Sequence, residues 1–211
     1  MPSLRLNNIG LVTLLLLGAC RTAYKSLQPA TGDAACIQQF APHFTNNLYS
    51  TQVNVLSHHL SGLLFCKQMP DSSVRMVFAN EMGFKFFDFE YTAQGTFIKH
   101  YLFHKMDKPA VVKTLQQDFE LVLLRPDLRQ AQVLTDGKYQ YVAIPSEKGR
   151  RYFITDKDCR QLVRIEKSSA RKAVVIVKMW HYQNGTPDSI SIHHTQFKFN
   201  IALQKTQQAT D

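Results

Sequence analysis

Apolar and polar residues alternate over most of the chain between positions 54 and 203, and a period of two predicts β-strands. Asp136-Gly137 and Asn184-Gly185 are dipeptides typical of tight hairpin turns between such strands. The expected strands cover residues 60–66, 74–78, 84–91, 97–103, 132–134, 139–144, 151–155, 161–166, 173–182, 189–193 and 197–203. The pattern therefore predicts a mostly antiparallel β-protein of about eleven strands.

Apolar residues recur at a helical spacing in one interior segment, residues 108–124. Asp107 is a plausible N-cap, and Pro109 is tolerated in the first turn. The helix has a broad apolar stripe, formed by Val111, Val112, Leu115, Phe119 and Val122. Such a stripe either packs on a sheet as core or forms a lid over a hydrophobic groove. A second, short helix is expected near residues 37–44.

These elements define a fold class that is mainly β with one or two helices (α+β). A long antiparallel meander curls, so we expect an incomplete β-barrel, or half-barrel, covered by the helix. Such a body is filled by its own side chains or leaves a ligand cavity. The composition changes nowhere abruptly after residue 30. We therefore expect a single domain over residues 31–205, followed by a polar tail at 206–211.

The start of the chain carries an export signal. Residues 9–17 form an apolar run that is too short to span a bilayer but has the length of a signal-peptide core. Leu17-Gly18-Ala19-Cys20 follows and resembles the lipobox of bacterial lipoproteins. That resemblance implies a signal peptide over 1–19, acylation of Cys20 and a lipidated tether over 20–30. An ordinary signal peptide and an uncleaved anchor are the alternatives.

The net charge of +9 comes from 25 basic and 16 acidic residues. Removal of residues 1–19 takes away Arg5 alone among the charged side chains, so the mature charge is +8. The basic residues are dispersed, and no nucleic-acid-binding motif accompanies them. For an exported protein held by lipid, anionic headgroups are the better partner, and we expect no nucleic-acid partner.

Three cysteines follow Cys20, namely Cys36, Cys66 and Cys159. An exported protein can form disulfides, but with three thiols at least one stays free or pairs with another chain. The sequence leaves the pairing open. Cys66 lies in an apolar strand, which favours a buried thiol without a reactive role.

No chemical motif stands out. The eight histidines lack the spacing of metal ligands, so we expect no metal and no cofactor. Asp88 and Glu90 lie on one face of a strand, with Lys85 and Lys99 as ordinary ion-pair partners. No nucleophile elbow or phosphate-binding glycine loop is present. We therefore expect no enzyme, and a hydrolase is the third-ranked function.

Three stretches resemble the outer-membrane lipoprotein receptor LolB and the fold that it shares with its soluble partner LolA. The segment from Leu60 to Leu64 is similar to the "L-x-G-x-L" first strand of that family. Residues 75–83 are similar to its next strand and turn, with Glu81 in place of a proline. Residues 186–192 and 197–203 are similar to its closing hairpin.

This resemblance implies an incomplete barrel, covered by helices, that holds the acyl chains of a lipoprotein in transit. It places on Met82 the role of an apolar turn residue that touches the membrane; the alternative is a methionine folded back onto the sheet. Large apolar residues should line the cavity, since few polar groups suit an acyl chain. The candidates are Phe87, Phe89, Tyr101, Phe103, Leu115, Phe119, Ile192 and Phe199.

The function expected is therefore an acyl-chain-binding lipoprotein that sorts or inserts lipoproteins, on the periplasmic face of the outer membrane. A soluble LolA-like carrier is a possible partner. The alternative is a structural or interaction lipoprotein with a solidly packed barrel. The sequence alone does not separate a filled interior from a cavity, because both need the same side chains.

Overall fold

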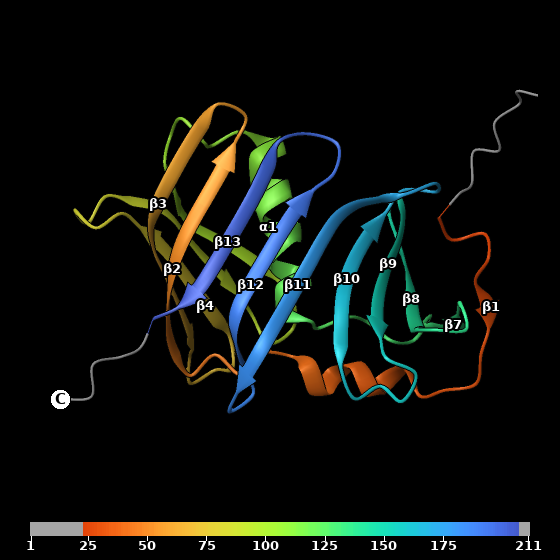
Figure 1. The fold of residues 1–211 in the computed structure, drawn as a ribbon. Coiled ribbons are helices and arrows are strands. Elements are labelled where there is room, and N and C mark those ends of the chain that lie inside the picture. Colours follow the sequence, from red (N-terminus) through yellow and green to blue (C-terminus); the bar gives the residue numbers. More distant parts are fainter. Residues whose placement is uncertain (1–22, 207–211) are drawn as a thin grey trace, which may run out of the picture.

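One antiparallel sheet of thirteen strands forms most of the protein in a computed structural model that describes residues 23–206 (Figure 1). The strand order is β1-β7-β8-β9-β10-β11-β12-β13-β2-β3-β4-β5-β6. The strands are β1 Gln28–Pro29, β2 Asn46–Val55, β3 His58–Gln68, β4 Val74–Ala79, β5 Lys85–Tyr91, β6 Phe97–Leu102, β7 Gln132–Thr135, β8 Gln140–Ser146, β9 Gly149–Thr155, β10 Leu162–Ser168, β11 Ala173–Gln183, β12 Thr186–His194 and β13 Phe199–Lys205. The sheet is open, because β1 and β6 end the order without pairing to each other.

The prediction of a mainly β protein with two helices is confirmed, and so are both hairpins. Asp136-Gly137 joins β7 to β8, and Asn184-Gly185 joins β11 to β12. Gly137, Asn184 and Gly185 have positive φ, as turns of this kind require. The structure adds two strands, β1 and β2, to the eleven expected. In β2 the polar residues Asn47 and Thr51 occupy buried positions, which hides its apolar alternation.

The interior helix α1 spans Pro109–Leu123, as predicted, but its N-cap is Lys108 rather than Asp107. The Lys108 side chain makes no capping hydrogen bond. The carboxylate of Asp107 instead accepts a hydrogen bond from Lys99 Nζ at 2.7 Å. The short helix is a 3₁₀ helix, η1, over Ala34–Phe40, a few residues earlier than expected. Neither described helix has the length and apolar character needed to cross a bilayer.

Helix α1 lies on one face of the sheet, which we call the inner face (Figure 1). Its Phe119 ring lies 5.5 Å from the ring of Phe87 on β5. The preceding residue of α1, Asp118, accepts a hydrogen bond from His194 on β12. Because β5 and β12 are well separated in the strand order, the sheet curves around α1.

A backbone contact fixes the glycine of the "L-x-G-x-L" segment. A Cβ atom built on Gly62 of β3 would lie 2.2 Å from the carbonyl oxygen of Ala79, at the end of β4. The register between β4 and β5 shifts at Ala79, so the chain bends there. Only a residue without a side chain allows this close approach.

The segment after Cys20 lies against the outer face of the sheet over the part that the structure describes. The ring of Tyr24 stacks on Tyr152 of β9, with centroids 4.2 Å apart, and its hydroxyl donates to Glu166 at 2.5 Å. β1 then pairs with β7. The expected tether over residues 20–30 is therefore packed on the domain from at least Tyr24 onward.

The cysteine pairing is resolved. Cys36 in η1 forms a disulfide with Cys159, in the turn before β10. Cys66 is a free thiol, 1% exposed, and burial raises its pKa. Its expected role as a buried side chain is confirmed.

Candidate functional site: the inner sheet face and the groove along α1

The inner face brings six of the eight predicted cavity residues into one apolar cluster. These are Phe87, Phe89, Leu115, Phe119, Ile192 and Phe199, each less than 9% exposed. The Phe87 and Phe89 rings are stacked with centroids 4.4 Å apart. The cluster joins α1 to β5 on one side and to β12 and β13 on the other.

Two of the predicted cavity residues lie elsewhere. Tyr101 is 39% exposed and stands opposite Asp88, on the outer face. Phe103 follows β6 and is half-buried, with its ring 5.0 Å from that of Phe84. A register shift between Asp88 and Phe89 moves β6 by one position, so that Leu102, 6% exposed, faces inward opposite Phe87. Alternation along β6 alone could not reveal this shift.

Packed side chains occupy the space between α1 and β5 in this conformation. The rings of Phe87 and Phe119 are in contact, and Leu115 and Val122 are buried beside them. The hollows along α1 lie on its more exposed side and have volumes of about 610, 440 and 160 Å³. Neighbouring hollows share Gln117, so they form one groove that follows the helix.

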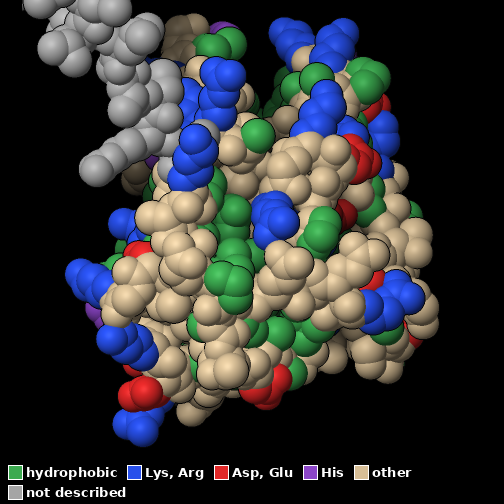
Figure 2. Space-filling view, turned by 90° about the vertical axis from the view of Figure 1, so that its right-hand side faces the viewer, with side chains coloured by type: hydrophobic (Ala, Val, Ile, Leu, Met, Phe, Trp, Pro, Cys, Tyr) green, Lys and Arg blue, Asp and Glu red, His purple; other side chains and the backbone are tan. Residues whose placement is uncertain are grey.

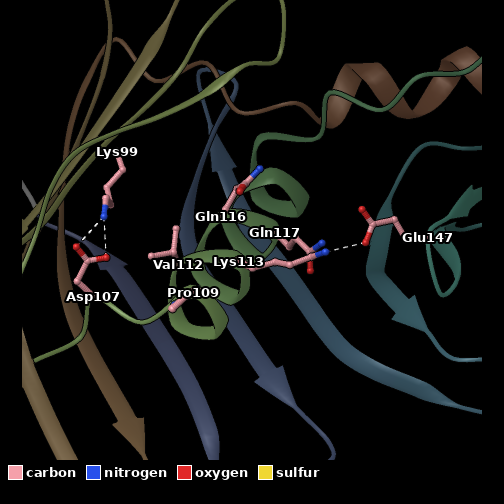
Figure 3. A pocket seen from close by; sticks show the side chains of 8 residues that line it. All are labelled: Lys99, Asp107, Pro109, Val112, Lys113, Gln116, Gln117 and Glu147. Carbon is pink, nitrogen blue, oxygen red and sulfur yellow. Dashed lines mark hydrogen bonds and ion pairs between the residues drawn. The ribbon is translucent and has the colours of Figure 1, made fainter.

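The groove is lined mainly by polar side chains. Figure 3 shows the largest hollow, where Lys99 and Asp107 lie on one side of α1 and Glu147 lies on the other. Lys113 Nζ of the helix donates to Glu147 at 2.8 Å. A groove of this kind suits a polar or charged ligand. The large apolar cluster lies on the other side of α1, between the helix and the sheet.

A buried polar pair fastens α1 to the sheet. The side chains of Asp118 and His194 are 2% and 7% exposed, and their Oδ2 and Nε2 atoms are 2.8 Å apart. Burial raises the pKa of Asp118, although the hydrogen bond from His194 opposes the shift. The His194 ring also packs on Phe199, with centroids 4.8 Å apart.

Met82 lies at the tip of the turn between β4 and β5, with 90% of its surface exposed. The side-chain oxygen of Asn80 accepts hydrogen bonds from the backbone N–H groups of Met82 and Phe84, at 3.1 and 2.8 Å. These bonds hold the turn with the methionine pointing out, so the alternative of a side chain folded onto the sheet is wrong. Phe84 next to it is 42% exposed.

The structure has a second exposed apolar tip, which no pattern in the sequence predicts. Leu56, in the β2–β3 turn, is 61% exposed, and Phe197, in the β12–β13 turn, is 46% exposed. The backbone N–H of Leu56 donates to the carbonyl of Lys198 at 2.8 Å, which joins the two turns. Single apolar residues in turns carry no pattern, so only the sheet order shows that these two are neighbours.

The acidic residues Asp88 and Glu90 of β5 form ordinary ion pairs. Burial raises the pKa of Asp88, but hydrogen bonds from Arg75 and Lys85 outweigh it and hold the pKa below its usual value. The expectation that Lys99 pairs with a carboxylate of β5 is wrong, because Glu90 bonds His100 and Lys99 bonds Asp107.

Within residues 23–206, no three His, Cys, Asp or Glu side chains converge to hold a metal ion. Figure 2 shows Lys and Arg side chains spread over one face, with several along its upper edge. Cys20 lies outside the described residues.

The architecture defines a class: an open antiparallel sheet that curves around one long helix. No known family model matches the chain, and no curated protein matches its sequence. Among solved structures, a LolA superfamily protein, NE2245 from Nitrosomonas europaea, superposes with a TM-score of 0.52 at 6% identity, over 84% of this chain and 93% of that one. The fold is therefore similar to that of a LolA superfamily protein, as the sequence resemblance implied.

Two other solved structures match with lower TM-scores. A DUF1329 family protein from Desulfovibrio piger has a TM-score of 0.46 at 10% identity, over 82% of this chain and 88% of that one. An outer membrane lipoprotein-sorting protein domain from Vibrio parahaemolyticus has a TM-score of 0.44 at 7% identity, over 81% and 87%.

Proposed function

We propose that this protein is a lipid-anchored envelope protein that binds acyl chains between α1 and the inner face, and that it sorts or inserts lipoproteins at the outer membrane. The observation that carries the proposal is the apolar inner face, rich in phenylalanine, beneath a helix with few polar ties to the sheet. The likeness of the fold to a LolA superfamily protein supports the proposal. The family resemblance described above implies a role in lipoprotein transfer.

Acyl chains would enter by displacing α1, which makes the sheet and helix a half-barrel with a movable cover. The helix starts without a side-chain cap or an acidic residue in its first turn, so its N-terminal end is weakly held. Its polar ties to the sheet include the pairs Asp118–His194, Gln116–Tyr91 and Gln117–Lys167.

The energetics allow such an exchange. Helix α1 buries five apolar side chains, Leu115, Phe119, Leu121, Val122 and Leu123, and exposing them costs roughly 8–15 kcal/mol at about 1.5–3 kcal/mol each. A palmitoyl chain has about 14 methylenes, and its burial gains on the order of 11 kcal/mol at about 0.8 kcal/mol each. The two free energies are of similar size, so an incoming chain offsets most of the cost of moving the helix side chains off the sheet.

The other surfaces fit this role. Acylation at Cys20 would hold the protein on the periplasmic face of the outer membrane, and the mature charge of +8 would attract anionic headgroups. Met82, held outward by the Asn80 turn, would probe the bilayer while cargo is delivered. A soluble LolA-like carrier would supply the cargo.

The filled interior favours a second candidate, an interaction lipoprotein whose sheet is a rigid scaffold for a partner protein. In that case α1 stays in place, because the Phe87–Phe119 contact is simply core.

Uptake of a fluorescent fatty acid separates the two candidates. The chain without residues 1–20 should bind 11-(dansylamino)undecanoic acid saturably, and palmitate should displace it. Phe119→Ala should bind as tightly or more tightly, because it frees space on the inner face. Tyr101→Ala, which removes an aromatic ring from the outer face, is the matched control and should change nothing. Absence of saturable binding in both the parent and Phe119→Ala would reject the carrier and leave the scaffold.

A further inference from the structure

Two cationic side chains face each other at one end of the inner face. Arg151 of β9 and Lys167 of β10 are direct cross-strand partners. They share a face with Phe153 and Ile165, which belong to the core beneath α1. Like charges directly opposite each other in a sheet are destabilising unless an anion lies between them. The apolar inner face therefore ends in two like charges, and an anion bound between them would relieve their repulsion.

Asp118, Glu120 and Glu147 act on Lys167 through their charge, but within residues 23–206 no carboxylate is hydrogen-bonded to either cation of the pair. Lys167 Nζ donates to the neutral oxygen of Gln117 at 2.5 Å. Arg151 Nε is buried and has no hydrogen-bond partner. The nearby carboxylate of Asp127 is already bonded by the guanidinium of Arg129, at 2.6 Å.

A second unpaired group lies in the same place. The hydroxyl oxygen of Ser146, at the end of β8, is also buried without a hydrogen-bond partner. Buried polar atoms in native proteins are nearly always bonded, to protein, water or ligand. Both atoms can donate, and both residues line one hollow, so a single acceptor bound there would satisfy the two of them.

All of these groups line the hollow of about 440 Å³ between α1 and the β8–β9 turn. Its charged side chains are the four cations Lys113, Lys148, Arg151 and Lys167 and the two carboxylates Glu120 and Glu147. Glu147 is paired with Lys113, as Figure 3 shows, and Glu120 accepts a hydrogen bond from the amide of Gln116. The hollow therefore has an excess of positive charge.

We propose that this hollow binds a phosphate-bearing ligand, whose phosphate lies between Arg151 and Lys167. A tetrahedral oxyanion accepts from a guanidinium, an ammonium, a hydroxyl and an amide together, and the site offers one of each in Arg151, Lys167, Ser146 and Gln117. The volume leaves room for an esterified group beside the phosphate, with Leu121 as an apolar contact. A phospholipid headgroup and a soluble phosphate share this chemistry.

The site lies beside α1 at the end of the inner face, and phosphate can bind there whether or not the protein carries acyl chains in its function. Calorimetry on the full chain in a neutral detergent tests it with two probes, dihexanoyl phosphatidylglycerol and inorganic phosphate. The double variant Arg151→Gln/Lys167→Gln should weaken binding at least tenfold. The matched control is a double variant that removes two cations from exposed positions elsewhere, Lys178→Gln/Lys157→Gln, and it should stay within twofold.

Each outcome bears on the proposal. Loss of lipid binding alone identifies a headgroup as the ligand, and loss of phosphate binding identifies a soluble one; both support the site. A thermal melt of the ligand-free double variant tests for misfolding. Its midpoint should equal or exceed that of the parent chain, because the substitutions remove two like charges that repel each other. The proposal is overturned if neither probe binds the parent chain, or if the double variant and the control bind alike.

Discussion

The Cys36–Cys159 disulfide should supply a large part of the stability of this domain. It joins residues 123 positions apart, and it ties η1 to the turn before β10. In the chain-entropy treatment, closing a loop of that length removes freedom from the unfolded chain that corresponds to about 5 kcal/mol at 25 °C. Natural domains of this size unfold with roughly 5–15 kcal/mol, so loss of the bond should leave the fold only marginally stable.

The perturbation is Cys36→Ser/Cys159→Ser, measured by urea denaturation with and without dithiothreitol. The double variant should lose about 2–5 kcal/mol. Reductant should bring the parent chain to the same value and leave the variant unchanged. Cys66→Ala serves as the control, since its thiol is buried but unbonded. The reasoning fails if reduction shifts the free energy of unfolding of the parent by less than about 1 kcal/mol, well below the range for a native disulfide.

Four further predictions follow from single positions. Met82→Glu should weaken liposome association while changing stability by less than about 0.5 kcal/mol, because the side chain is 90% exposed; a large loss in a thermal melt would instead mark it as core. Gly62→Ala should lower the urea midpoint by the equivalent of roughly 1–3 kcal/mol, because its Cβ would meet Ala79 O at 2.2 Å, whereas the exposed neighbour in Ser61→Ala should cost little; equal effects would contradict the steric argument. Burial raises the pKa of Asp118 in the folded chain. In the unfolded chain the same carboxyl loses its proton near pH 4, so above that pH the folded chain binds the proton more tightly. Relative to Asp118→Asn, the parent should therefore lose stability as the pH rises from about 4 through the raised pKa, and urea midpoints that diverge in the other direction would refute this. Cys20→Ala should abolish incorporation of radiolabelled palmitate, and label that persists would place the lipid elsewhere.

Alternation and helical spacing predicted most of the fold, because they report which side of an element is buried. The helix and both hairpin turns follow directly from such local signals. The failures occur where tertiary contacts override the local pattern. β2 buries Asn47 and Thr51, so its apolar alternation is hidden. The register shift beside Asp88 turns Tyr101 outward. Asp107 bonds Lys99, so it does not cap α1.

The candidate site could be predicted only in part, and for a related reason. The pattern predicts the inward position of Phe87, Phe89 and Phe119, because large apolar residues at regular spacing must face the core. Arg151 and Lys167 look like any two surface cations in the sequence, and only the register of β9 and β10 places them opposite each other. Charge pairing across a sheet depends on that register, which one-dimensional patterns do not encode.

The position of α1 connects the two proposed sites. Its buried side carries Leu115 and Phe119 onto the inner face, and its groove side carries Lys113 and Gln117 into the cationic hollow. Displacement of the helix by an acyl chain would also move Gln117 away from Lys167 and separate the walls of that hollow. A phosphate bound there would therefore favour the closed position of α1, and acyl-chain uptake would oppose phosphate binding by the same free energy. The two proposed ligands should then compete although their sites do not overlap.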